Sequence, residues 1–312
     1  MPGNIYQCNE HIKRLCLQEH HTTFLFILPL AKTIKMSNEI VNLPTIAEIE
    51  AAAEVLSMPD NSTKVVWVKE KFAVKFSNGI PLSEAENMKF LAANSKVLVP
   101  KVYTAFIDLE TNQTFIIMEY IRGDNPQKLL PSLMPTEKVI ICKLVKDAII
   151  KLQKISLPGY LGTLNHQPYH DSVFWTKDNN PLISGPFANQ KEMNCRILER
   201  LHQTELSQYI QLLQKTVDST LHNHHPVFTH GDLQLKNIMV EKAESRNDGS
   251  PAFKIILIDW EIAGWYPEYW EFCNATISCR FKPNWLELIP DILDQYPVEY
   301  LIMQVVYSAV FY

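Results

Sequence analysis

The chain has 312 residues, of which 46% are apolar and 20% are charged, a balance typical of a globular protein with a sizeable core. Its net charge is −5 and it contains no basic patch with interleaved aromatic residues, so nucleic acid is not an expected partner and neutral or cationic small substrates are favoured. Six scattered cysteines without a CxxC pair indicate reduced thiols in a cytoplasmic protein and exclude a disulfide framework or a cysteine-based zinc site.

The first 35 residues contain one apolar run, 24–30, which is far too short to span a membrane. A long lead before this run and the lack of a clear small-residue cleavage site do not fit a secretory signal. Met36 opens a segment, 37–56, that is typical of a domain start. We therefore expect residues 1–35 to be an upstream translation extension or a disordered tail, and we expect no membrane span.

Two short strands are predicted next, over 65–68 and 72–76, joined by a polar turn. Lys75 lies inside the second apolar run and needs an anionic partner or a phosphate there, because burying an unpaired ammonium group is costly. A helix is predicted over 83–91, and Glu84 near its start can form an ion pair with Lys75. Glu86 is the competing partner, and two ordinary surface charges are the alternative.

The middle of the chain is predicted to be mainly helical. A strand over 115–121 precedes a long helix over 137–154 with apolar residues at helical spacing. The segment 190–217 reads as one helix, and 285–310 reads as one or two closing helices split around Tyr296 and Pro297.

The most informative segment is His-Gly-Asp-Leu-Gln-Leu-Lys-Asn at 230–237, followed by a hairpin of predicted strands, 238–240 and 253–258. Asn237 begins the first strand and Asp259 follows the second, so the two side chains should meet at one end of the hairpin. Carboxylate and amide oxygens are ligands that suit Mg²⁺ together with phosphate oxygens. A single Asp is usually a loop or cap residue. This ordered set, with Asp232 included, indicates phosphoryl transfer.

These motifs, HGDLxxxN and IDWExAGxYPxxWE, resemble the aminoglycoside phosphotransferase/choline kinase family, and within it the fungal branch of small-molecule phosphotransferases. The resemblance covers about Val65 to Glu271. It implies an α+β, bilobal, protein-kinase-like fold, with a small antiparallel-sheet lobe over 36–118 and a mainly helical lobe over 119–312. It also implies ATP as co-substrate, Mg²⁺ as cofactor, and an unidentified small-molecule hydroxyl acceptor.

The resemblance assigns roles in the catalytic segment as well. Asp232 would be the catalytic base, Asn237 and Asp259 the metal ligands, and His230 a structural support of the loop. Protein kinases carry Arg where this chain has Gly231, and Asp-Phe-Gly where it has Asp-Trp-Glu at 259–261.

In the nucleotide-binding lobe, the resemblance implies that Lys75 and Glu84 position the α- and β-phosphates. Adenine would hydrogen-bond the backbone around Glu119 and Ile121, at a hinge between the lobes, although a plain core strand is the alternative for this segment. The segment between Pro59 and Val74 contains no glycine, which departs from the Gly-rich phosphate loop of protein kinases.

The expected function is therefore ATP-dependent phosphorylation of a small-molecule hydroxyl. The alternatives are a protein Ser/Thr kinase, and a catalytically silent pseudokinase or binding module, which the glycine-free loop favours. Aromatic residues gather near Asp259 together with acidic residues. They would either hold an amine of the acceptor or pack in the core, the more common use of such side chains. These residues are Trp260, Trp265, Tyr266, Tyr269 and Trp270, with Glu261, Glu268 and Glu271.

Overall fold

The computed structural model describes residues 33–36, 39–59, 61–176, 180–244, 251–279 and 282–311, and the chain divides into two units, Met1–Leu43 and Pro44–Tyr312. In the first unit, β1 (Thr33–Met36) and β2 (Glu39–Asn42) form an antiparallel hairpin. Most of the expected N-terminal extension, residues 1–32, lies outside the described residues. No helix in the described part of the chain is long and apolar enough to cross a membrane.

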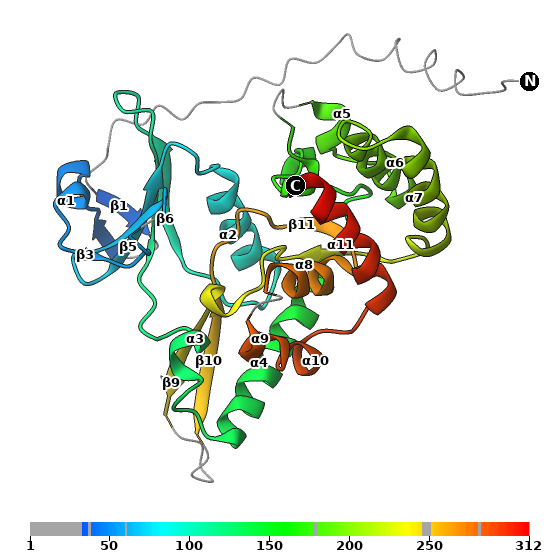
Figure 1. Cartoon of the computed structure of the whole chain (residues 1–312). Helices are drawn as coiled ribbons and strands as arrows, with labels where there is room; N and C mark the ends of the chain where they lie inside the picture. The colour runs from blue at the N-terminus through cyan, green and yellow to red at the C-terminus, as the bar shows by residue number, and fades with distance from the viewer. Residues whose placement is uncertain are drawn as a thin grey trace, which may run out of the picture. The chain divides into compact units, whose positions relative to one another are not determined.

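The second unit begins with α1 (Ile46–Glu50) and a five-stranded antiparallel sheet in the order β3-β4-β5-β7-β6 (Figure 1). The strands are β3 (Glu54–Val55), β4 (Lys64–Val68), β5 (Phe72–Ser77), β6 (Val102–Ile107) and β7 (Thr114–Glu119). Lys75 lies opposite Val65 on one side and Ile116 on the other, so this lysine sits in the middle of the sheet. The β4–β5 hairpin agrees with the sequence prediction.

One helix of this lobe, α2 (Ser83–Asn94), packs beside β6. Its buried face consists of Glu84, Ala85, Asn87, Met88 and Leu91. Apolar positions at helical spacing predicted this helix, but the buried Glu84 and Asn87 are polar exceptions on the same face. Both make tertiary contacts, since Asn87 Nδ2 donates to the backbone oxygen of Trp260 at 2.8 Å.

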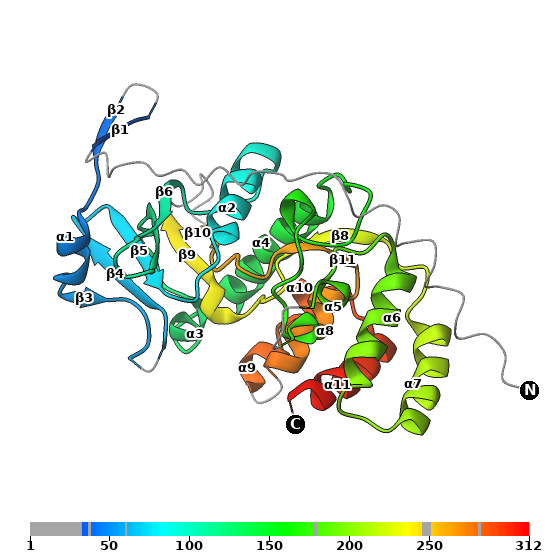
Figure 2. The same cartoon turned by 90° about the horizontal axis from the view of Figure 1, so that it is seen from above.

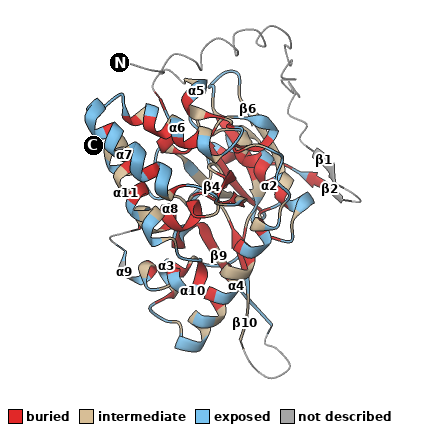
Figure 3. Cartoon of the chain, turned by 90° about the vertical axis from the view of Figure 1, so that its right-hand side faces the viewer, coloured by how far each residue is buried: buried red, intermediate tan, exposed pale blue. Residues whose placement is uncertain are grey.

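The remaining lobe is mainly helical. Its helices are α3 (Pro126–Leu129), α4 (Pro135–Gln153), α5 (Pro181–Ser184), α6 (Gln190–Leu201), α7 (Ser207–Thr220), α8 (Trp270–Ser278), α9 (Pro283–Leu286), α10 (Ile289–Ile292) and α11 (Pro297–Phe311), with short 3₁₀ turns η1 (Leu164–His166), η2 (Ser172–Phe174) and η3 (Leu235–Asn237). Buried residues lie on the inner sides of these helices and exposed residues on their outer sides (Figure 3).

The prediction of one helix over 190–217 was wrong, because α6 and α7 are separate helices that lie side by side (Figure 2). The apolar spacing continues on both sides of the break, which hid it. Thr204 ends the first helix by bonding Leu201 through both its amide and its hydroxyl, and Leu206 is extended with ψ 140°. Local side-chain hydrogen bonds of this kind compete with helix continuation.

Two small antiparallel sheets lie within this lobe, on either side of the segment 230–237 that carries the predicted catalytic base. β9 (Ile238–Ala243) pairs with β10 (Ala252–Leu257), as the sequence predicted. β8 (Pro226–Thr229) pairs with β11 (Gly264–Pro267), a strand that the sequence did not reveal. The predicted α+β architecture with an antiparallel-sheet lobe and a mainly helical lobe is thus confirmed, while the lobe boundary between 118 and 119 stays a prediction.

Candidate functional site

Asp232 lies on the loop between β8 and β9, with both side-chain oxygens held by neighbours. Oδ1 accepts a short hydrogen bond from Gln234 Nε2, and Oδ2 accepts one from Asn237 Nδ2 at 2.9 Å. The ammonium group of Lys236 lies 3.3 Å from Oδ2. The carboxylate is thus fixed in orientation while remaining partly open to solvent, with a side chain that is 20% exposed.

His230 connects this loop to the strand end that carries Asp259. Its Nδ1 accepts from the Asp232 backbone N–H at 3.2 Å, so Nε2 carries the proton and donates to the Ile258 carbonyl oxygen at 3.0 Å. The ring is fully buried and lies against Trp260, with ring centres 4.5 Å apart. These contacts fit the bracing role that the resemblance implies for His230.

Glu271, at the start of α8, holds the same loop in place through its side-chain carboxylate. Its Oε2 accepts from the backbone N–H groups of His230, at 2.7 Å, and Gly231, at 3.4 Å. Burial raises the pKa of this carboxyl, against the opposing effect of His230 and the backbone donors. Glu271 therefore supports the loop and does not face solvent, which agrees with the packing alternative for this residue and not with amine binding.

Gly231 occupies a position where a side chain is strained. Its φ of +85° lies in the left-handed region, and a Cβ there would meet the Ile262 Cγ2 methyl at 2.9 Å. An arginine here, as protein kinases carry, would have to adopt this left-handed backbone conformation and also avoid the Ile262 side chain. The glycine thus gives the sequence difference from protein kinases a structural reason.

Asn237 and Asp259 lie at the same end of the β9–β10 hairpin, as predicted. The Ile258 N–H donates to the Asn237 carbonyl at 3.0 Å, which extends the ladder to the residue before Asp259. The side-chain nitrogen of Asn237 is used on Asp232, because it donates to the Asp232 backbone oxygen at 2.8 Å as well as to the carboxylate. Among the described residues, nothing donates to the Asn237 side-chain oxygen, which leaves that atom for a cation.

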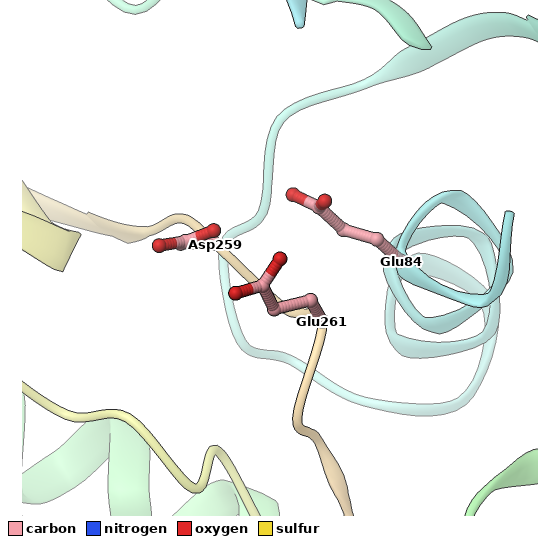
Figure 4. Close-up of side chains that lie close together, drawn as sticks. All are labelled: Glu84, Asp259 and Glu261. Atoms are coloured by element: carbon pink, nitrogen blue, oxygen red, sulfur yellow. The ribbon is translucent and has the colours of Figure 1, made fainter. Parts of the chain in front are cut away.

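Lys75 contacts three carboxylates, one from its own lobe and two from the helical lobe. Its Nζ lies 2.8 Å from Glu84 Oε2, 2.6 Å from Asp259 Oδ1 and 3.6 Å from Glu261 Oε2. Figure 4 shows the three acidic side chains pointing toward one another, with Glu84 on α2 and the other two on the segment after β10. The predicted Lys75–Glu84 pair is present, whereas the competitor Glu86 is exposed. The contacts with Asp259 and Glu261 span the lobes and could not be predicted.

The electrostatics of this cluster favour a charged lysine. Burial alone would lower the pKa of Lys75, but Glu84, Asp259 and Glu261 together raise it. Burial raises the pKa of Glu84 to about 7, against the attraction of Lys75. One ammonium thus faces up to three carboxylates, whose oxygens lie within 4.8 Å of one another. The cluster carries excess negative charge, a setting that suits a divalent cation.

The segment after β7, where the sequence predicts a hinge between the lobes, presents one unused backbone donor. The N–H of Glu119 donates to Lys101 O at 2.9 Å, and that of Tyr120 donates to Lys71 O at 3.0 Å. The N–H of Ile121 has no hydrogen-bond acceptor in the described part of the chain. Gly123 then lets the chain pass close to β9, because a Cβ there would overlap the Val240 carbonyl oxygen.

The glycine-free segment begins in the β3–β4 connection and continues through β4 into the start of β5. Ser57 shapes it, because the Ser57 hydroxyl accepts from the Val65 N–H at 3.2 Å. Farther along, the Thr63 and Ser77 hydroxyls lie 3.3 Å apart. Asn61 and Ser62 are exposed at the tip. Side-chain hydroxyls thus order a turn that protein kinases build with glycine.

A cavity of about 540 Å³ opens beside Asp232 in the helical lobe. Its walls come from the catalytic loop, the start of η2, the end of α8 and the closing helix α11. Asp171 and Gln304 are among the lining residues and lie far from the motif in sequence, so spacing could not reveal them. The aromatic residues near Asp259 belong to the core, the use that the sequence favoured for them: Trp260, Trp265, Tyr266, Tyr269 and Trp270 are at most 3% exposed.

Comparison with known proteins agrees with this geometry. Residues 60–301 match the model of the phosphotransferase enzyme family, APH. No curated protein matches the chain significantly. The apo structure of a thermostable mutant of aminoglycoside phosphotransferase APH(4)-Ia is 13% identical, with 85% of this chain and 86% of that chain covered and a TM-score of 0.53. A ternary complex of another mutant of that enzyme with AMP-PNP and hygromycin B is 11% identical, with coverage of 84% and 87% and a TM-score of 0.54. At such identities the similarity shows a shared fold.

Proposed function

Because the chain belongs to the phosphotransferase enzyme family, we propose that it transfers the γ-phosphate of ATP to a hydroxyl group of a small molecule. The observation that carries this proposal is the meeting of two groups from different lobes. The catalytic-loop carboxylate of Asp232 and its partner Asn237 stand at the hairpin end where Asp259 pairs with Lys75 of the sheet. Phosphoryl transfer needs a positioned acceptor and positive charge at the phosphates, and this arrangement supplies groups for both.

Asp232 acts on the acceptor in this proposal. Its carboxylate borders the 540 Å³ cavity and is held by Gln234 and Asn237, so it can orient a hydroxyl bound there and accept its proton. His230 and Glu271 keep the loop in place through backbone bonds. They are positioning residues, because neither side chain lines the cavity.

Lys75 acts on the nucleotide, where its ammonium group would bind the α- and β-phosphates while Glu84 keeps it oriented. The side-chain oxygens of Asn237 and Asp259 fit Mg²⁺ in number and hardness, and Mg²⁺ bound there would offset charge on the phosphates. Adenine would occupy the hinge, with the free N–H of Ile121 and the carbonyl of Glu119 as its backbone partners. The ternary complex of an APH(4)-Ia mutant with AMP-PNP and hygromycin B, a protein of the same fold, supports nucleotide binding by this chain.

The test combines nucleotide binding with turnover. Calorimetry should detect Mg·ATP binding, and a screen of hydroxyl compounds should reveal acceptor-dependent ADP release. Asp259→Ala should remove the Mg²⁺ dependence of ATP binding, and unchanged Mg·ATP affinity would show that Asp259 is not a ligand. Mg·ATP binding without ADP release for any acceptor would favour a binding module, and phosphorylation of peptide arrays would favour a protein kinase.

A further inference from the structure

The cavity beside Asp232 is lined by elements of the helical lobe and not by Lys75, Glu84 or the segment at Glu119 and Ile121, to which the nucleotide is assigned. Its volume of about 540 Å³ lies within the range of small-molecule sites, so it can enclose an acceptor of drug-like size. The loop that carries Asp232 forms one part of the lining, and α11 forms another part. The chemistry of the lining therefore selects the acceptor.

Carboxylates in the lining are few and mostly engaged. Among the described residues that line the cavity, only Asp171 and Asp232 are acidic. Asp171 is 2% exposed and accepts from Val173 N–H at 2.9 Å, Asn274 Nδ2 at 3.0 Å and Trp270 Nε1 at 3.1 Å. The Tyr307 hydroxyl lies 3.2 Å from both of its oxygens. Because these donors occupy the Asp171 carboxylate, Asp232 is the remaining carboxylate in the described lining that could bind a cationic group. Asp232, however, is needed for the reacting hydroxyl.

Cationic acceptors are disfavoured by this lining. An acceptor with several ammonium groups loses hydrating water from each of them on binding, and each would need a carboxylate in its place. An acceptor with a quaternary ammonium group would need a carboxylate or an aromatic cage. Tyr307 is the one aromatic residue in the described lining, and its hydroxyl is engaged with Asp171 and Asn274. Glu261 faces Lys75 on the nucleotide side and does not line the cavity. Lys236 and Lys282 add positive charge near Asp232 and Gln234.

Anionic acceptors are disfavoured for the converse reason, since no Lys or Arg lines the cavity among the described residues. What the walls do offer is apolar surface and neutral hydrogen-bonding groups. Ile262 and Ile277 are only partly buried and give the apolar part. Gln304 lines the cavity from α11, and its side-chain amide has no hydrogen bond with the described residues, so the amide N–H₂ donor and the amide oxygen acceptor both remain for a ligand.

We propose that the acceptor is an uncharged alcohol with an apolar face and at least one further hydrogen-bonding group, as in an aryl glycoside or a hydroxylated ring. This inference rests on the proposed function and names the substrate class of the same site. It separates the chain from a phosphotransferase of polycationic antibiotics, the kind of ligand that hygromycin B represents in the APH(4)-Ia complex.

The test is a matched acceptor screen on the full chain with Mg·ATP. Uncharged probes would be methyl and phenyl glucosides, inositol and cyclohexanediols, and charged probes would be choline and hygromycin B. ADP release should rise with at least one uncharged probe and stay at the background level with both cations. ADP release with a cation and with no uncharged probe would overturn the inference while leaving the proposed function intact. Mg·ATP binding without ADP release from any probe would overturn both.

Variants of the lining sharpen the result. Gln304→Leu should raise KM for the active uncharged probe about tenfold and leave KM for ATP unchanged, because the lost groups face the acceptor. Leu301→Ala, one turn earlier on α11 with its side chain 63% exposed, is the matched control and should change neither value. Ile277→Asp adds a carboxylate to the cavity and should weaken the uncharged probe while permitting choline binding. Equal KM values for Gln304→Leu and the control would refute the assignment of this wall.

Discussion

Gly231→Ala should destabilise the protein and displace Asp232, the proposed catalytic base. The substitution puts a Cβ on a backbone with φ +85°, a conformation that costs a non-glycine residue about 1–2 kcal/mol. The added carbon would lie 2.9 Å from Ile262 Cγ2 and 3.2 Å from its carbonyl oxygen. Relieving such overpacking costs about a further 1–3 kcal/mol. We therefore expect a loss of about 2–5 kcal/mol, a large share of a typical folding free energy.

The measurement is urea unfolding followed by tryptophan fluorescence, which reports on six tryptophans, including Trp260 beside His230. The matched control is Gly79→Ala, because a Cβ at Gly79 meets nothing within 4 Å and its φ is not in the left-handed region. The control should change stability by less than about 1 kcal/mol. Turnover of Gly231→Ala should also fall about a hundredfold, since the adjacent Asp232 shifts. Equal unfolding midpoints for the two variants would refute the reasoning.

Three further substitutions test other parts of the site. Asp232→Asn should lower phosphoryl transfer about a thousandfold while calorimetry finds Mg·ATP affinity within about twofold of the parent, because the base is lost and the nucleotide contacts remain; equal turnover would contradict its role. Lys75→Met leaves the buried Glu84 carboxylate without its cation, so urea unfolding should show a loss of about 3–5 kcal/mol, and a loss below about 1 kcal/mol would contradict the pairing. Glu271→Gln keeps an oxygen for the loop amides and removes an ionisation. Burial raises the pKa of Glu271 above its ordinary value of 4.5, so the folded protein holds a proton that the unfolded chain has released. The parent should therefore lose stability relative to Glu271→Gln as pH rises above 4.5, and a constant difference between about pH 5 and about pH 8 would exclude this linkage.

The local spacing of apolar residues was sufficient to predict the strands and the helix on which the site residues lie. Alternating and helical apolar spacing predicted the β4–β5 hairpin, α2 and the β9–β10 hairpin, because each buries one face against its neighbours. The placement of Asn237 and Asp259 at one hairpin end followed from strand pairing alone. The Lys75–Glu84 pair followed from the cost of burying an unpaired lysine.

Other predictions failed where local pattern is ambiguous. The α6–α7 break was missed because apolar spacing continues on both sides of it. The β8–β11 pair was missed because its second strand, Gly264–Pro267, is short and was taken as part of an aromatic cluster. For Glu271 the sequence left amine binding and packing as alternatives, and the fold decides for packing, because its carboxylate accepts from the backbone N–H of His230.

The sequence alone thus predicted the motif residues and the class of reaction that they indicate. It could do so because these residues lie close together along the chain, on an eight-residue loop and the hairpin that follows it. The acceptor cavity was decided by tertiary structure alone. Asp171 and Tyr307 meet across 136 positions of chain, and Lys75 meets Asp259 across 184. Contacts of that range depend on how helices and sheets pack, and no spacing within a single element encodes which side chains such packing brings together.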